Sequence, residues 1–128
     1  MPRTPLVPKG SAPPLAPYSP GVKSGNMVFV SGVLPMDAKG ATVGRGDVRA
    51  QTRQVIESIR AILEAGGATL DDVTMNTIIL KDLSDYAAMN SVYAEYFGRN
   101  PPARYCIRAD LVKPDFLVEI ASIAVVDR

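Results

Sequence analysis

The distribution of proline constrains the fold of this chain more than any other sequence feature. Seven of its eleven prolines lie within the first twenty residues. Because proline fixes its own backbone dihedral and lacks an amide hydrogen, such a segment cannot form a helix or a central strand. At 128 residues the chain has the length of one domain. We therefore predict a single domain over residues 1–128, in which residues 1–15 form an extended proline-rich arm.

After the arm, the sequence alternates between strand-like and helix-like segments. Apolar residues recur at helical spacing in residues 47–65 and 84–97, with Asp47 and Ser84 as the expected N-caps. Each of these segments is followed by glycine, which favours a helix end. Apolar runs rich in β-branched residues predict strands at 27–31, 73–81, 103–109 and 116–126. This order predicts an α+β fold with two helices packed on one face of a mixed sheet.

The residues that the sequence lacks exclude several function classes. Without histidine, neither a Ser-His-Asp triad nor a histidine-containing metal site is available, so we expect no metal and no cofactor. The lone cysteine forms no disulfide within the chain, no run approaches the ~20 apolar residues of a membrane span, and no signal peptide is recognisable. The net charge of +1 is not that of a dedicated nucleic-acid binder. We expect a cytoplasmic protein with neither nucleic acid nor membrane as a partner.

Two charged residues stand inside otherwise apolar, strand-like segments. Arg104 lies in the sequence PPARYCI and Glu119 in VEIASIA. Burying either ion alone costs several kcal/mol, so each needs a partner or a polar ligand. If the last two strands form a hairpin, the two side chains lie within ~5 to 8 Å of each other. The pattern fits a structural ion pair and half of an active site equally well, the latter with arginine gripping a carboxylate and glutamate moving protons.

Two neighbouring features have simpler interpretations. Cys106 shares a strand face with Arg104, but it has no histidine to activate it, so we interpret it as a core residue rather than a nucleophile. The aromatic stripe of the second helix is more typical of a core face than of a ligand pocket. This stripe consists of Tyr86, Met89, Tyr93, Tyr96 and Phe97.

Five short motifs, in order along nearly the whole chain beyond the first dozen residues, resemble the RidA/YjgF family of enamine and imine deaminases. They are APYSPG at 16–21, VSG at 30–32, YAAMN at 86–90, PARYC at 102–106 and VEIASIA at 118–124. The last two are the most specific signature of the family. Residues 50–53 and 111–115 most resemble the family members that act in pyrimidine degradation.

The resemblance implies a chorismate-mutase-like fold, assembled as a homotrimer with an active site in each cleft between subunits. The family's carboxylate-binding arginine corresponds to Arg104, and its acid–base glutamate corresponds to Glu119. Its remaining pocket side chains and backbone N–H donors also have counterparts in this sequence. The residues expected to be catalytic are Glu119, Arg104, Tyr18 and Ser31. The residues expected to bind substrate are Arg104, Cys106, Asn90 and Gly32.

The resemblance to the pyrimidine-degrading members implies a deaminase that hydrolyses 3-aminoacrylate to malonic semialdehyde and ammonia, without metal or organic cofactor. Two alternatives stay open. One is a general deaminase of 2-iminobutanoate and 2-iminopropanoate, which would use the same pocket to remove reactive enamines and imines. The other is a protein without enzymatic activity that acts on RNA or binds small carboxylates.

Overall fold

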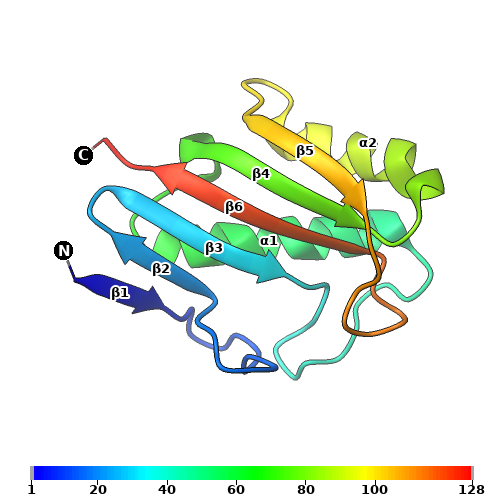
Figure 1. The fold of residues 1–128 in the computed structure, drawn as a ribbon, viewed down its shortest axis with the longest axis horizontal. Coiled ribbons are helices and arrows are strands. Elements are labelled where there is room, and N and C mark those ends of the chain that lie inside the picture. Colours follow the sequence, from blue (N-terminus) through cyan, green and yellow to red (C-terminus); the bar gives the residue numbers. More distant parts are fainter. Residues whose placement is uncertain (1, 128) are drawn as a thin grey trace.

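The computed structural model describes residues 2–127, and a six-stranded mixed sheet with two helices on one face dominates them (Figure 1). The strands are β1 (Arg3–Leu6), β2 (Gly21–Ser24), β3 (Met27–Val33), β4 (Val73–Leu80), β5 (Ala103–Arg108) and β6 (Val118–Val125). The helices are α1 (Val48–Ala65) and α2 (Tyr86–Phe97). The strands lie in the order β1-β2-β3-β6-β4-β5. The predicted α+β fold is confirmed.

The proline-rich start contributes the outermost strand of the sheet. β1 pairs only with β2, antiparallel, with Pro5 opposite Val22. Proline is tolerated in such an edge strand because one side of the strand has no partner that needs its amide hydrogen. β2 was not predicted from the sequence, and it forms a hairpin with β3. Gly25, at φ +60°, supplies the left-handed conformation in that turn.

The two helices begin in different ways. The Asp47 carboxylate accepts a hydrogen bond from the Ala50 amide, so α1 has the predicted N-cap. The prediction that Ser84 caps α2 is wrong, because Asp82 accepts a hydrogen bond from the Ser84 amide at 2.9 Å. This bond starts a 3₁₀ turn, and α2 itself begins only at Tyr86. No helix within residues 2–127 has the length and apolar character needed to cross a membrane.

The last two strands do not form the hairpin that would bring Arg104 close to Glu119. β5 lies parallel to β4 at the edge of the sheet, whereas β6 lies between β3 and β4 and is antiparallel to both. β4, α2 and β5 form a βαβ unit, so the chain must return from the sheet edge to its middle before β6. Arg104 is paired with Asn76 and Glu119 with Ile79, and both partners belong to β4. A whole strand therefore separates the arginine from the glutamate.

The two faces of the sheet differ in what covers them. The helix-covered face carries the core, with fully buried side chains such as Val28, Ile78, Leu80 and Ile120. The opposite face, toward the viewer in Figure 1, carries no helix. Large apolar side chains on this face are between 37% and 52% exposed; they are Phe29, Tyr105, Ile107 and Val125. This helix-free face is thus apolar but uncovered in one chain.

Candidate active site

Helix α2 holds the guanidinium of Arg104 against the edge strand β5. Arg104 Nη2 donates to Asn90 Oδ1 at 2.7 Å and to the Tyr86 hydroxyl at 3.1 Å. The guanidinium carbon lies 4.7 Å from the centroid of the Tyr93 ring and 5.7 Å from that of Tyr86. Arg104 Nη1 and Nε have no hydrogen-bond partner within residues 2–127. The group is fixed on one side and free to grip a carboxylate on the other.

Sequence reasoning assigned Tyr86 and Tyr93 to the core and missed their contact with Arg104. Only Tyr93 is buried, at 6% exposure, whereas Tyr86 is 45% exposed. A signal was present, because Tyr86, Asn90 and Tyr93 are spaced i, i+4, i+7 and so share one face of a helix. An amide flanked by two aromatic rings at this spacing is a suitable cradle for a guanidinium.

Cys106 lies on the same face of β5, two residues after Arg104, and is half-buried. Burial raises the pKa of its thiol, and this effect outweighs the opposing influence of the Arg104 charge. The thiol therefore stays protonated at neutral pH, which does not suit a nucleophile. β5 is an edge strand, so the backbone along its outer side has no strand partner among the described residues 2–127.

Glu119 lies on the helix-free face of β6, between the buried residues Val118 and Ile120 of the opposite face. Burial raises the pKa of its carboxyl group above its usual value. Gly32 is in direct contact, since a Cβ atom at this position would lie 2.1 Å from Glu119 Oε2. The register of β3 against β6 shifts between Val30 and Val33, as in a β-bulge. The bulge presents the backbone of β3 to the carboxylate.

Ser31 connects this bulge to the segment that carries Tyr18. The Ser31 hydroxyl donates to the Ser19 carbonyl at 2.6 Å, and the Ser31 amide donates to the Pro20 carbonyl at 3.0 Å. Tyr18 is 41% exposed and lines a cavity together with Ser31 and Gly32. The four predicted site residues Tyr18, Ser31, Gly32 and Glu119 therefore lie at one end of β3.

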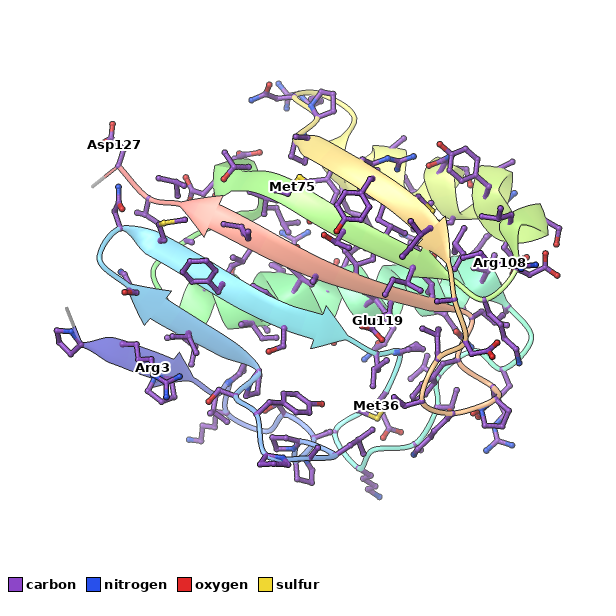
Figure 2. All side chains as sticks on the ribbon, in the orientation of Figure 1. Arg3, Met36, Met75, Arg108, Glu119 and Asp127 are labelled. Atoms are coloured by element: carbon purple, nitrogen blue, oxygen red, sulfur yellow. The ribbon has the colours of Figure 1, made fainter. Side chains whose placement is uncertain are left out.

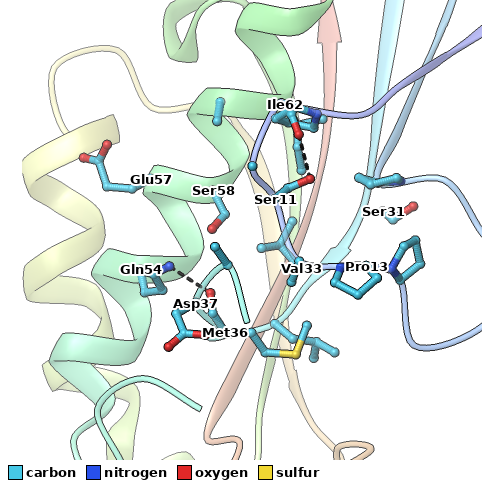
Figure 3. Close-up of a pocket in the computed structure, with 18 of the residues that line it drawn as sticks. Ser11, Pro13, Ser31, Val33, Met36, Asp37, Gln54, Glu57, Ser58 and Ile62 are labelled. Atoms are coloured by element: carbon cyan, nitrogen blue, oxygen red, sulfur yellow. Dashed lines mark hydrogen bonds between the residues drawn. The ribbon is translucent and has the colours of Figure 1, made fainter. Parts of the chain in front are cut away.

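The cavity occupies about 350 Å³ between the arm, α1 and the end of β3 (Figure 3). Its walls are mostly apolar, and two of its polar side chains bond to the backbone: Gln54 donates to the Met36 carbonyl and Ser11 to the Pro8 carbonyl, each at 2.8 Å. Neither Arg104 nor Glu119 lines it. We regard this cavity as a recess beside the cluster of Tyr18, Ser31, Gly32 and Glu119 (the Glu119 cluster), rather than as a site in which Arg104 binds a carboxylate.

The predicted site residues thus form two clusters that do not meet within one chain. Arg104, Asn90 and Cys106 lie at the helix-covered face of the β5 edge, whereas the Glu119 cluster lies on the opposite face near the end of β3. In Figure 2, Glu119 lies beside the end of β3, and Arg108, which ends β5, lies toward the far edge. No group of three or more His, Cys, Asp or Glu residues suited to a metal ion is present in the described part of the chain.

The chain is similar to known proteins both in sequence and in structure. The family model described as Endoribonuclease L-PSP matches residues 9–126. The chain is 54% identical over 124 residues to the 3-aminoacrylate deaminase RutC of Acinetobacter baylyi, covering 97% of this chain and 98% of that protein. The crystal structure of the E. coli YjgF gene product is 33% identical with a TM-score of 0.87, covering 98% of this chain and 99% of that one. The crystal structure of E. coli TdcF with bound serine is 32% identical with a TM-score of 0.87, covering 95% and 98% of the two chains.

Proposed function

Because this chain belongs to the Endoribonuclease L-PSP family, we propose that it is a 3-aminoacrylate deaminase, the activity of the RutC protein that it resembles along 97% of its length. The family membership confirms the RidA/YjgF resemblance. The observation that carries the proposal is the state of Arg104, which α2 holds through Nη2 while Nη1 and Nε have no partner among residues 2–127. The substrate is a short carboxylate, and TdcF, which is similar to this chain, holds serine, another three-carbon carboxylate.

Arg104 binds and orients the substrate carboxylate in this reaction. Nη1 and Nε are the guanidinium donors without a partner within residues 2–127. Their N–H bonds point to different sides of the group, so the carboxylate accepts a charge-assisted hydrogen bond from one of them. Fixing the carboxylate places the adjacent carbon, C2, and the amino-bearing carbon, C3, at defined positions. Backbone N–H groups at Cys106 and near Gly32 assist, as the family resemblance implies.

Glu119 exchanges protons with the substrate and activates the attacking water. Protonation of C2 converts the enamine to an imine, water then adds to C3, and the resulting carbinolamine releases ammonia and leaves malonic semialdehyde. A carboxyl group whose pKa is raised by burial is suited to give and take protons near neutral pH. The Ser31 hydroxyl donates its hydrogen bond to the Ser19 carbonyl, so its oxygen is available to accept a hydrogen bond from the water. Tyr18 helps to order the same water.

Assembly of the site requires a second copy of the chain, because the two clusters lie on opposite faces of one sheet. The homotrimer implied by the resemblance places the Arg104 cluster of one subunit against the Glu119 cluster of the next. The exposed apolar side chains of the helix-free face, including Phe29 and Tyr105, support such an assembly since they are costly to leave in water. We also propose a cytoplasmic location, because a lone cysteine is typical of proteins in a reducing compartment.

Turnover of two enamines tests the substrate. 3-Aminoacrylate and 2-aminoacrylate are each generated in situ, and ammonia release is compared with the spontaneous rate. We expect saturable acceleration with the higher kcat/KM for 3-aminoacrylate, abolished in Arg104→Ala and retained in Arg108→Ala, an exposed arginine of the same strand. Faster turnover of the 2-aminoacrylate imine would favour the general deaminase. Carboxylate binding without any acceleration would favour a binding protein.

Mixing two inactive variants tests the shared site. If each site takes Arg104 from one subunit and Glu119 from its neighbour, randomly mixed oligomers of Arg104→Ala and Glu119→Gln regain about a quarter of the wild-type activity. If both residues served one site within a chain, every chain would remain defective and no activity would return. RNA binding that disappears at high salt while deamination persists would mark an RNA effect as incidental.

A further inference from the structure

Two buried polar side chains, Asn76 of β4 and Ser122 of β6, form a row with Arg104 of β5 across the helix-covered face. Asn76 of β4 is paired in register with Arg104 on one side and with Ser122 of β6 on the other. The Ser122 hydroxyl donates to Asn76 Oδ1 at 2.5 Å, and Asn76 Nδ2 donates to the Tyr93 hydroxyl at 2.9 Å. The row therefore ends on the aromatic ring against which the Arg104 guanidinium lies.

This row lies deep in an apolar core. Asn76 is 0% exposed and Ser122 is 2% exposed, and their neighbours on the same face include Ile78 and Ile120, both fully buried. Polar groups are tolerated at such depth only when they are hydrogen-bonded. Both ends of the Asn76 amide are engaged, with Ser122 and with Tyr93, so the amide already has a partner at each end. One of these two bonds connects the buried row to the Tyr93 hydroxyl.

Tyr93 is the rigid wall of the guanidinium site. Its ring packs on Phe97 with centroids 4.7 Å apart, and its hydroxyl is fixed by Asn76. The other aromatic contact of Arg104, Tyr86, is 45% exposed and lies farther from the guanidinium carbon, at 5.7 Å. Both hydrogen bonds from α2 engage Nη2 alone. The plane of the guanidinium, and with it the direction of Nη1 and Nε, therefore depends on the Tyr93 ring.

We infer that Asn76 and Ser122 are positioning residues which, through Tyr93, aim the free side of Arg104 at the substrate carboxylate. The inference rests on the proposed function, because it gives Arg104 the carboxylate as its ligand. It adds a specific expectation. Disrupting the row weakens carboxylate binding and raises KM, while the chemical step, which depends on Glu119 of the neighbouring subunit, proceeds at nearly the same kcat.

The test measures carboxylate binding separately from turnover. The dissociation constant of propionate, a three-carbon carboxylate that cannot be deaminated, is measured by calorimetry together with KM and kcat for 3-aminoacrylate. In Asn76→Leu and in Tyr93→Phe we expect the propionate dissociation constant and KM to rise about tenfold, with kcat within about twofold. The double variant should bind propionate no more weakly than either single variant, because both changes break the same row.

A matched control separates positioning from general destabilisation. Val92→Ala truncates a buried residue of α2, 2% exposed and next to Tyr93 in sequence, that is outside the row. We expect it to lower the thermal midpoint without changing the propionate dissociation constant. Ser122→Ala removes only the far hydroxyl and should weaken propionate binding about threefold, so it carries the test if Asn76→Leu does not fold.

Two results would overturn the inference. If Arg104→Ala loses propionate binding while the row variants bind it like the parent and are merely less stable, the row is structural and the proposed function stands. If Arg104→Ala itself retains full propionate binding, the carboxylate site is elsewhere, and the proposed role of Arg104 fails together with the inference.

Discussion

The arginine and glutamate clusters treat their charged groups in opposite ways. Arg104 is held by two hydrogen bonds and two aromatic rings, all from α2. Glu119 forms no ion pair and no side-chain hydrogen bond within residues 2–127. Because Gly32 has no side chain, the Glu119 carboxylate can lie against the backbone at that position. A group that binds substrate benefits from a fixed orientation, whereas a group that exchanges protons benefits from being partly desolvated and unpaired. The contrast predicts different kinetic consequences for the two clusters.

The largest effect is expected from removing the acid–base group. Glu119→Gln keeps the shape of the side chain but cannot exchange a proton, so kcat should fall by about 10²- to 10⁴-fold with KM changed less than about threefold. Steady-state ammonia release measures both constants. Glu64→Gln, on the exposed side of α1, is the matched control and should behave like the parent. A rise in KM with unchanged kcat would place Glu119 in binding rather than catalysis.

Arg104→Lys should act mainly on KM. Lysine keeps the positive charge but loses the planar fork, the stacking on Tyr93 and the geometry of the bond to Asn90. We expect KM to rise by about 30- to 100-fold, with a smaller decrease in kcat, because an ammonium replaces a planar group with fixed N–H directions by a point charge. Initial rates over a series of 3-aminoacrylate concentrations give KM and kcat for the variant and the parent. Equal losses in kcat and kcat/KM at unchanged KM would contradict the binding role.

The fold was predictable where one local signal determines the outcome. The 47–65 helix followed from its periodicity and from the Asp47 cap, and both are present in α1. The partners of β5 and β6 were not predictable, because both strands are apolar runs and nothing in their sequences specifies a neighbour. The assumed hairpin gave the wrong pairing, and the structure instead places β4 between Arg104 and Glu119.

The candidate site was predictable only as a set of residue types. The motifs around Arg104 and Glu119 indicate the right kind of chemistry, but the face on which each side chain lies depends on strand register. A shift of the register by one residue moves every side chain of the strand to the other face of the sheet. The role of Asn76 was missed because its bond to Tyr93 forms only when α2 is docked on the sheet, whereas Tyr93 was missed although its spacing from Tyr86 and Asn90 was a signal. That Arg104 and Glu119 serve one site remains a prediction, and the mixing experiment tests it.

Gly32→Ala should impair the glutamate cluster without touching the arginine cluster. The added methyl group would lie 2.1 Å from Glu119 Oε2, so the carboxylate must move. We expect kcat to fall about tenfold or more, since small displacements of catalytic groups have large kinetic effects. In a Glu119→Gln background the same substitution should change kcat little, because it acts through the missing carboxylate. Full additivity would show that Gly32 acts independently of Glu119.

The raised pKa of Glu119 has a consequence for stability as well as for activity. Since the folded state holds this proton more tightly than the unfolded chain, the stabilising contribution is complete below the usual pKa of glutamate and is lost as pH rises through the raised value. The free energy of unfolding of Glu119→Gln should therefore rise relative to that of the parent from about pH 4 upward. Urea denaturation across this range measures the difference.

The smallest effect is expected at Cys106, within the arginine cluster. The pKa of its thiol is raised by burial, so the sulfur is not a thiolate at neutral pH, and only the backbone at this position faces the substrate in the proposed site. Cys106→Ala should leave kcat/KM within about twofold of the parent, whereas Arg104→Lys, two residues away, raises KM strongly. Reaction with a thiol reagent followed by assay gives a second measurement, since a bulky adduct should block the carboxylate site while alanine does not. A Cys106→Ala variant that folds and assembles but has no activity would show that the thiol itself takes part, and the division between a binding cluster and a proton-exchanging cluster would then no longer hold.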